Sequence, residues 1–290
     1  MSNAQRIARI NDVLYLIHRD LAANLSARRL SQVAAYSEQN FHRVFQKVVG
    51  ETVLRYVRRV RLEQAANQLM FAPSCPIAEI AEACGYMSLS SFGKVFVAQF
   101  GMTPGQWRKV DRRAQSPAYL LDPEIAAGYS RIKALDLPQA KLLELAPREV
   151  AYVRHQGYGR SIRFAWQTLQ VWASTESRPF SPQIGLHHSN PAWTPLPQCR
   201  YVACLGIDRP LERRGVVNSM SIPGGLHAVF YFSGRYGELL PWTSKVLEQW
   251  LPASGFKAKS TPAFVEYQKN HFLAEDEHFE LRYYLPVSFF

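Results

Sequence analysis

Hydrophobic side chains recur at helical intervals between residues 85 and 108. The apolar positions lie on one face of the predicted helix: Phe92, Val95, Phe96 and Phe100. The opposite face carries short, small or basic side chains: Ser90, Ser91, Gly93, Lys94 and Val97. Gly85 gives a turn signal before this stretch, and Gly101 with Pro104 ends it. We therefore predict a helix over 89–100 that packs through one face and presents the other.

The same pattern occurs earlier in the chain. A shift of 51 residues lays the segment from about 30 to 58 onto the segment from about 81 to 109. The matches include core, stop and basic positions: Ser37 on Ser88, Phe41 on Phe92, Arg43 on Lys94, Gly50 on Gly101 and Tyr56 on Trp107. Such agreement indicates an internal duplication, which predicts two helical units with equivalent surfaces.

The segments around these units also read as helices. Residues 4–21 show an amphipathic pattern, and a short helix near Leu30 precedes a turn, with Ser37 as the N-cap of a longer helix that Gly50 ends. This order is typical of a helix-turn-helix, whose second helix fits the DNA major groove. A long helix over 52–71 carries four arginines and spans roughly 30 Å. That length is close to the ~34 Å turn of duplex DNA, although a solvated basic helix is the alternative.

From about residue 141 the pattern changes to β-rich segments with two helices. Residues 141–155 and 219–233 read as strands. A second duplication, at a shift of about 78 to 82, has these matches: Gly157-Tyr158-Gly159 with Tyr236-Gly237, Trp166 approximately with Trp242, Trp172 with Trp250, Pro182 with Pro262, and Arg200-Tyr201 with Arg282-Tyr283. The fold class predicted is multi-domain: an all-α double helix-turn-helix domain over 1–112, a linker over 113–140, and an α+β domain over 141–290. Two pseudo-symmetric strand-helix-strand repeats would form a groove where they meet.

Charge is distributed unevenly between these regions. Residues 1–113 hold 16 Lys and Arg against 8 Asp and Glu, whereas the remaining residues hold 18 against 15. A basic first part predicts a polyanionic partner, most simply nucleic acid, for that part alone. The composition is that of a soluble protein, and neither an apolar run of 18 residues nor a signal-peptide core is present. We expect a cytoplasmic protein without a membrane partner.

Residue spacing gives little indication of catalysis or metal binding. The four cysteines have no metal-ligand spacing, and the eight histidines do not cluster as ligands. A Ser-His-Asp set and a phosphate-binding loop are also missing from the sequence. The prediction is therefore a protein with no catalytic residues, no metal and no cofactor.

The first duplication carries a specific signature. Its second copy holds Gly85-Tyr86, Ser88, Ser90, Phe92, Phe96, Phe100-Gly101, Thr103-Pro104 and Trp107-Arg108. Its first copy and the helix that follows hold Tyr36-Ser37, Phe41, Phe45, Gly50, Tyr56, Arg61-Leu62 and Ala65. Over 10–109 the chain resembles the AraC/XylS DNA-binding domain. The resemblance implies seven helices, with recognition helices at about 38–49 and 89–100.

The resemblance also implies residues that contact DNA. Gln39, His42 and Arg43 stand where the family reaches base edges, and Arg43 is the strongest candidate because a guanidinium can bond guanine O6 and N7 together. Asn40 and Lys47 would contact bases at the rim or phosphates. The second helix offers Leu89, Ser90, Ser91 and Lys94 at the equivalent places. We expect the first helix to carry sequence choice and the second to contribute chiefly phosphate affinity.

The C-terminal half resembles the GyrI-like effector-binding domain. The resemblance rests on Ile222-Pro223-Gly224-Gly225, His227-Ala228-Val229-Phe230, Gly234-Arg235-Tyr236, Trp250-Leu251-Pro252, Ser254-Gly255-Phe256, 262–267, Glu280-Leu281 and Leu285-Pro286-Val287. A reader domain of AraC type placed first and a GyrI-like domain placed last resembles the Rob-type regulators.

Glu266 matches the acidic position of the GyrI-like ligand groove. Strand alternation places Phe264 and Glu266 on one face and Tyr267 on the other. A carboxylate among aromatic side chains suits a cationic, lipophilic ligand, so Glu266, Phe264, Tyr267 and Trp166 are the predicted effector-binding residues. The alternatives are a salt-bridged strand glutamate and aromatic side chains that belong to the core.

These readings lead to a transcription regulator that is not an enzyme and senses a small molecule, in the manner of a multidrug sensor. Its expected partners are double-stranded promoter DNA and a small-molecule effector, with RNA polymerase as a further candidate. Two alternatives concern the C-terminal domain. It could be a hydrolase with Glu266 as base and a nearby tyrosine as acid, or a protein-interaction module without a ligand.

Overall fold

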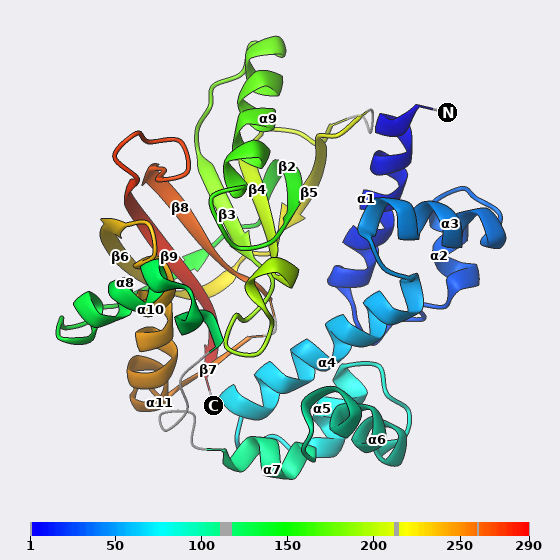
Figure 1. The fold of residues 1–290 in the computed structure, drawn as a ribbon, viewed down its shortest axis with the longest axis horizontal. Helices are drawn as coiled ribbons and strands as arrows, with labels where there is room; N and C mark the ends of the chain where they lie inside the picture. The colour runs from blue at the N-terminus through cyan, green and yellow to red at the C-terminus, as the bar shows by residue number, and fades with distance from the viewer. Residues whose placement is uncertain (1, 111–117, 212–214, 260, 290) are drawn as a thin grey trace. The chain divides into compact units, whose positions relative to one another are not determined.

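A computed structural model of the chain describes residues 2–110, 118–211, 215–259 and 261–289. It contains two compact units, one built mainly on the residues up to 110 and the other on those from 118 onward (Figure 1). Among the described residues, none of the helices has both the length and the apolar composition needed to cross a membrane.

The N-terminal unit is all-helical, as predicted. Its helices are α1 (Asn3–Arg19), α2 (Ala27–Val33), α3 (Glu38–Val49), α4 (Val53–Phe71), α5 (Ile77–Ala83), α6 (Leu89–Phe100) and α7 (Pro104–Lys109). These seven helices over residues 2–110 confirm the predicted number. The two predicted recognition helices, 38–49 and 89–100, coincide with α3 and α6.

Identical local chemistry begins and ends α3 and α6. The hydroxyls of Ser37 and Ser88 each accept a hydrogen bond from the backbone N–H three residues later, at 3.4 Å. At the other end Gly50 and Gly101 take left-handed conformations, with φ of 85° and 73°. The duplicated caps explain why both helices contain 12 residues.

Each helix-turn-helix packs around an equivalent aromatic triad. Phe41, Phe45 and Tyr56 are buried in the first, and successive rings meet edge to face at centroid distances of 5.6 and 5.7 Å. In the second unit Phe92, Phe96 and Trp107 repeat this arrangement at 5.4 and 5.7 Å. The duplication seen in the sequence is therefore a duplication of core packing.

Helix α4 connects the two helix-turn-helix units. It is about 28 Å long, and α1–α3 lie toward one end and α5–α7 toward the other (Figure 1). Two of its four arginines stabilise the fold: Arg59 forms ion pairs with Glu51 and Glu63, and Arg61 donates hydrogen bonds to the carbonyl oxygens of Leu21 and Ala23. Arg55 and Arg58 are exposed.

The C-terminal unit is a mostly antiparallel sheet with helices. Its strands are β1 (Lys141–Leu145), β2 (Arg148–Gln156), β3 (Gln183–His187), β4 (Arg200–Gly206), β5 (Asn218–Ile222), β6 (Gly225–Arg235), β7 (Phe256–Ala258), β8 (Ala263–Lys269) and β9 (His278–Phe289). Its helical elements are η2 (Ala118–Leu121), α8 (Pro123–Lys133), α9 (Ile162–Thr175), η3 (Leu196–Gln198), α10 (Leu239–Lys245), η4 (Val246–Trp250) and α11 (Leu251–Ala253).

The strand order shows the predicted pseudo-symmetry. The order is β1-β6-β9-β8-β3-β4-β2-β5, with β7 beside β9. Each strand of the first repeat has a counterpart in the second: β1 corresponds to β5, β2 to β6, β3 to β8 and β4 to β9. When every strand is replaced by its counterpart, the same order is obtained, read from the opposite edge of the sheet. The two repeats therefore meet at the β3–β8 pair. The first strand of each repeat pairs with a strand of the other repeat: β1 pairs with β6, and β5 lies beside β2.

The predicted strands at 141–155 and 219–233 are each divided in two. The breaks fall at 146–147 and 223–224, where Pro147 and Pro223 have no backbone N–H to donate to a ladder. Each break turns one predicted strand into a strand that joins the other repeat and a strand that stays in its own. Strand content was thus predicted correctly, and the swap was not.

The range predicted as a linker, 113–140, contains η2 and α8 as elements of the C-terminal unit; residues 113–117 lie outside the described part. Tyr119 and Ser244 hydroxyls lie 2.7 Å apart, and Lys245 Nζ donates to the Ile132 carbonyl at 3.2 Å, so this segment packs against α10. Helix α8 buries Ile125, Gly128 and Ile132 at helical spacing, but one of these three residues is glycine, which explains why the apolar pattern in its sequence is weak.

Candidate functional site

Helix α3 presents a polar surface opposite its buried face. Gln39, Arg43 and Lys47 are exposed, and Asn40 and His42 are half-buried. Arg43 Nη2 donates a hydrogen bond to Asn40 Oδ1 at 3.0 Å. All five predicted contact residues of this helix therefore lie together, and Asn40 orients the guanidinium of Arg43.

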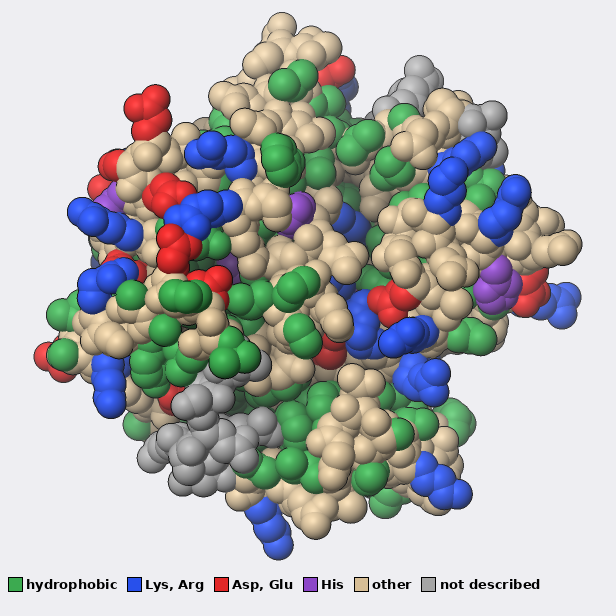
Figure 2. Space-filling model, viewed as in Figure 1, with side chains coloured by type: hydrophobic (Ala, Val, Ile, Leu, Met, Phe, Trp, Pro, Cys, Tyr) green, Lys and Arg blue, Asp and Glu red, His purple; other side chains and the backbone are tan. Residues whose placement is uncertain are grey.

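Helix α6 presents a different surface at the equivalent place. Leu89, Ser90, Ser91 and Lys94 are exposed, as predicted. All of them except Ser91 border an open hollow of about 600 Å³, which is lined by Ile77, Leu89, Ser90, Gly93, Lys94, Val97, Thr103, Pro104 and Gly105. In Figure 2, Lys and Arg side chains gather over α1–α4, whereas the face around α5–α7 shows mainly hydrophobic and uncharged side chains.

The four residues predicted to bind an effector do not form one site. Trp166 and Tyr267 are buried together, with ring centroids 5.7 Å apart, and the Tyr267 hydroxyl lies 3.3 Å from that of Tyr201. Phe264 is on the other face of β8, where it stacks on Tyr284 at 4.5 Å. Strand alternation separates these aromatic side chains, which belong to the core.

Glu266 is a paired carboxylate. It forms an ion pair with Arg148 and lies 3.6 Å from Arg282 across the β8–β9 ladder, and its side chain is 16% exposed. Its charge is therefore balanced by arginines of the same sheet. Tyr267 points to the opposite face of the strand, so the two do not meet as an acid and a base at one reacting atom.

A cavity of about 350 Å³ lies instead at the beginning of α9. Its lining combines charged and aromatic side chains from three segments: Arg160, Ser161, Arg163, Phe164, Tyr236, His271, Phe272 and Glu277. None of the four predicted effector residues belongs to it. The sequence did hold one signal, because Tyr158 and Tyr236 are matched in the second duplication and Tyr236 lines this cavity.

Arg160 lies at the rim of the cavity between two carboxylates. Its Nε and Nη2 donate to Glu277 at 2.6 and 2.7 Å, and its guanidinium also bonds both carboxylate oxygens of Glu124 in α8. These hydrogen bonds lower the pKa of both glutamates. The guanidinium carbon stands 4.1 Å from the centre of the Tyr236 ring. A cation thus occupies a position formed by one aromatic face and two carboxylates.

His271 forms the inner wall of this cavity. It is 5% exposed, and its Nδ1 has no hydrogen-bond partner among the described residues. Burial lowers the pKa of His271 to about 3, so the imidazole is neutral near pH 7. A neutral imidazole has one donor and one acceptor nitrogen, so His271 adds to this lining of charged and aromatic side chains a polar nitrogen without a hydrogen-bond partner in the described part of the chain.

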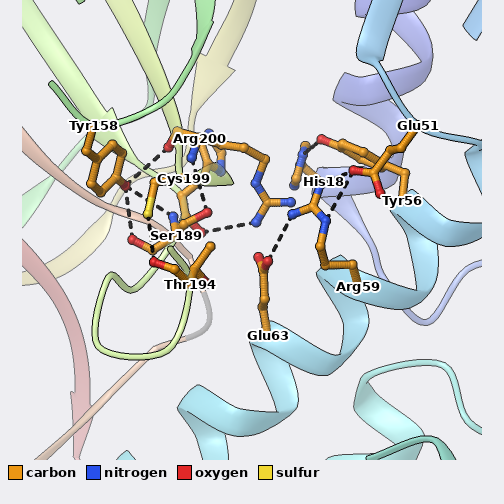
Figure 3. Close-up of polar contacts among 11 residues, drawn as sticks. His18, Glu51, Tyr56, Arg59, Glu63, Tyr158, Ser189, Thr194, Cys199 and Arg200 are labelled. Carbon is orange, nitrogen blue, oxygen red and sulfur yellow. Dashed lines mark hydrogen bonds and ion pairs between the residues drawn. The ribbon is translucent and has the colours of Figure 1, made fainter. Parts of the chain in front are cut away.

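In the first repeat, other residues fill the position that corresponds to the cavity beside Tyr236 in the second repeat. Tyr158 matches Tyr236, but its hydroxyl lies 3.0 Å from the Ser189 carbonyl oxygen and 3.2 Å from that of Arg200, and it accepts a hydrogen bond from the Ser189 N–H (Figure 3). The loop between β3 and β4 thereby fills this half. Within the described part of the chain the Tyr236 hydroxyl makes no such hydrogen bond, and the cavity beside Tyr236 in the second repeat remains open.

Comparison with known proteins identifies both units. A family model described as a helix-turn-helix domain matches residues 30–110, and one described as a GyrI-like small molecule binding domain matches residues 138–288. The RCS-specific HTH-type transcriptional activator RclR of Escherichia coli K12 is 41% identical over 80 residues, which are 28% of this chain and 28% of RclR. The chain therefore spans less than a third of that relative's length.

Two further similarities cover more of the molecules compared. The HTH-type transcriptional activator AarP of Providencia stuartii is 32% identical over 117 residues, or 40% of this chain and 85% of AarP. A solved EcmrR–DNA complex aligns over 91% of this chain and 99% of that chain, with 13% identity and a TM-score of 0.45. Among the described residues no group of His, Cys, Asp and Glu is arranged to hold a metal ion.

Proposed function

This chain belongs to the AraC-type helix-turn-helix regulators and to the GyrI-like small molecule binding family, and on that premise we propose that it binds promoter DNA and adjusts this binding to a small-molecule effector. The observation that carries the DNA-binding part is the duplicated unit. The faces of α3 and α6 opposite the aromatic triads occupy equivalent positions toward the two ends of α4.

We propose that the first surface selects sequence. Gln39, His42 and Arg43 would reach base edges, and Asn40, which accepts a hydrogen bond from Arg43, would hold its guanidinium in place. Lys47 on α3 and Lys94 on α6 are exposed cations suited to phosphates. Selection of bound fragments from the genome with the full chain tests this proposal. A recovered site should contain two half-elements about one helical turn apart, and recovery without any enriched sequence would overturn it.

We propose that the effector is a lipophilic cation and that it enters the cavity beside Arg160. The guanidinium already shows that the Tyr236 ring with Glu124 and Glu277 accommodates a positive group. A ligand cation would replace the guanidinium there, while Phe164, Phe272 and neutral His271 would contact its apolar part. Replacement would also release Glu124, which lies in α8 shortly after the segment between the two domains.

This competition gives a direct test with the full chain. Tryptophan fluorescence would follow titration with a panel of aromatic quaternary ammonium dyes and their neutral isosteres. Arg160→Met removes the competing cation and should tighten dye binding about tenfold, whereas Glu277→Gln should weaken it. Tyr231→Phe, a change at an exposed tyrosine of the same sheet, is the matched control. Saturable binding that favours neutral isosteres, or no binding at all, would contradict the proposed ligand class.

RNA polymerase remains a predicted partner. Transcription in vitro from a recovered promoter, with and without the full chain, would determine whether it activates or represses.

A further inference from the structure

The two recognition surfaces differ in polarity at three equivalent positions. The shift of 51 residues pairs Leu89 with Glu38, Gly93 with His42 and Val97 with Gln46. Each of these three polar side chains of α3 is thus replaced in α6 by an aliphatic residue or by glycine. The Lys94 and Arg43 pair keeps a positive charge at the same place in both helices.

These apolar side chains are exposed. Leu89 is 52% exposed, Val97 is 39% exposed, and Met87, just before the helix, is fully exposed. Leu89 and Val97 line the hollow beside α6, which contains Lys94 and no acidic residue. A partner that fits this surface therefore combines negative charge with small apolar groups.

Gly93 lies between Leu89 and Val97 on this face. A Cβ atom built at Gly93 would meet nothing within 4 Å, so the packing of the chain does not require glycine there. Glycine inside a helix lowers the stability of the helix, so neither packing nor helix stability accounts for glycine at this position. It does allow an external surface to approach the helix backbone closely.

Duplex DNA offers such a partner in its major groove. The thymine C5-methyl group is the apolar feature that base edges present there, and aliphatic side chains contact it. We infer that α6 reads thymine methyl groups through Leu89 and Val97, with Gly93 allowing close approach and Lys94 holding a neighbouring phosphate. This inference rests on the proposed DNA-binding function and adds base recognition to the second helix, from which only phosphate affinity was expected.

The test uses deoxyuridine, which pairs like thymidine but lacks the methyl group. A duplex recovered by selection with the full chain would be remade with uracil at single thymines, first in the half-site of α6 and then in that of α3. Loss of one methyl contact should weaken binding about fourfold in the α6 half-site. Leu89→Ala or Val97→Ala should remove the difference between the thymine and uracil duplexes, because both side chains are exposed and the fold does not depend on them.

Gly93→Ala separates recognition from folding. The alanine variant should melt at the same or a higher temperature than the parent, yet bind the selected duplex several-fold more weakly. Equal affinity for thymine and uracil duplexes, or a selected site without thymine beneath α6, would overturn the inference and leave a regulator that reads sequence through α3. A hollow that serves a protein partner would give that same result. Failure to enrich any DNA would overturn the proposed function together with the inference.

Discussion

Replacement of Arg43 by alanine tests which helix selects the operator. Arg43 is exposed on α3, and its Nη2 atom donates to Asn40 Oδ1 at 3.0 Å, which restrains the guanidinium beside Asn40. Lys94 stands at the equivalent position of α6, where a single ammonium lacks the planar pair of donors that matches guanine. The two substitutions should therefore alter binding in different ways.

The expected sizes follow from these contacts. Loss of a bidentate guanine contact costs about 1–3 kcal/mol, and a loss of about 2 kcal/mol weakens binding roughly 30-fold. Asn40→Ala keeps the guanidinium but frees its side chain, so it should cost about 0.5–1.5 kcal/mol. Lys94→Ala should weaken all duplexes alike and lower the salt slope of log K by about 0.9.

Fluorescence anisotropy on one selected duplex and its single-base variants would measure these effects between 50 and 200 mM salt, concentrations across which phosphate contacts change affinity by orders of magnitude, roughly 10³–10⁵-fold for six to ten contacts. Lys47→Ala is the control, because it removes an exposed charge from α3 without touching the Arg43–Asn40 pair. Arg43→Ala should discriminate less between the selected base and its variants. If Lys94→Ala relaxed base preference more than Arg43→Ala did, the assignment of sequence choice to α3 would be refuted.

Three further predictions concern stability and the role of Glu266. Phe96→Ala should lower the free energy of unfolding by about 3–5 kcal/mol in urea titration, because the ring is fully buried in the second aromatic triad; a loss below 1 kcal/mol would contradict that packing. Glu266→Gln should cost only about 1 kcal/mol and leave dye affinity unchanged, because its carboxylate pairs with arginines outside the cavity; a large loss of dye binding would restore it as an effector residue. Burial lowers the pKa of His187 to about 4 and that of His271 to about 3, so the unfolded chain binds more protons below pH 6.5. Stability should fall by up to about 1.4 kcal/mol per pH unit for each imidazole between pH 6.5 and 4, and denaturation curves insensitive to pH in that range would refute their burial as neutral groups.

Local chemistry fixed much of the N-terminal unit in advance. Ser37 and Gly50 begin and end one recognition helix, and Ser88 and Gly101 do the same for the other, so both ranges followed from residues close in sequence. The α4 arginines show the limit of this reasoning. A charge count places Arg61 among the surface cations, whereas its guanidinium satisfies the carbonyls of Leu21 and Ala23, 40 and 38 residues away.

The sequence alone determined the duplications, the helix ends of the first unit and the alternation of β8, because these depend on neighbours along the chain and on fixed helical and strand periods. Tertiary structure decided which polar groups meet. Alternation already separated Glu266 from Tyr267, yet only the β8–β9 pairing brought Arg282 beside that glutamate, and only the fold brought Arg148 there. The cavity joins the start of α9, the turn after β6 and the segment between β8 and β9. Arg160 and Glu277 in these segments are 117 residues apart in the sequence, and no local pattern indicates that they converge.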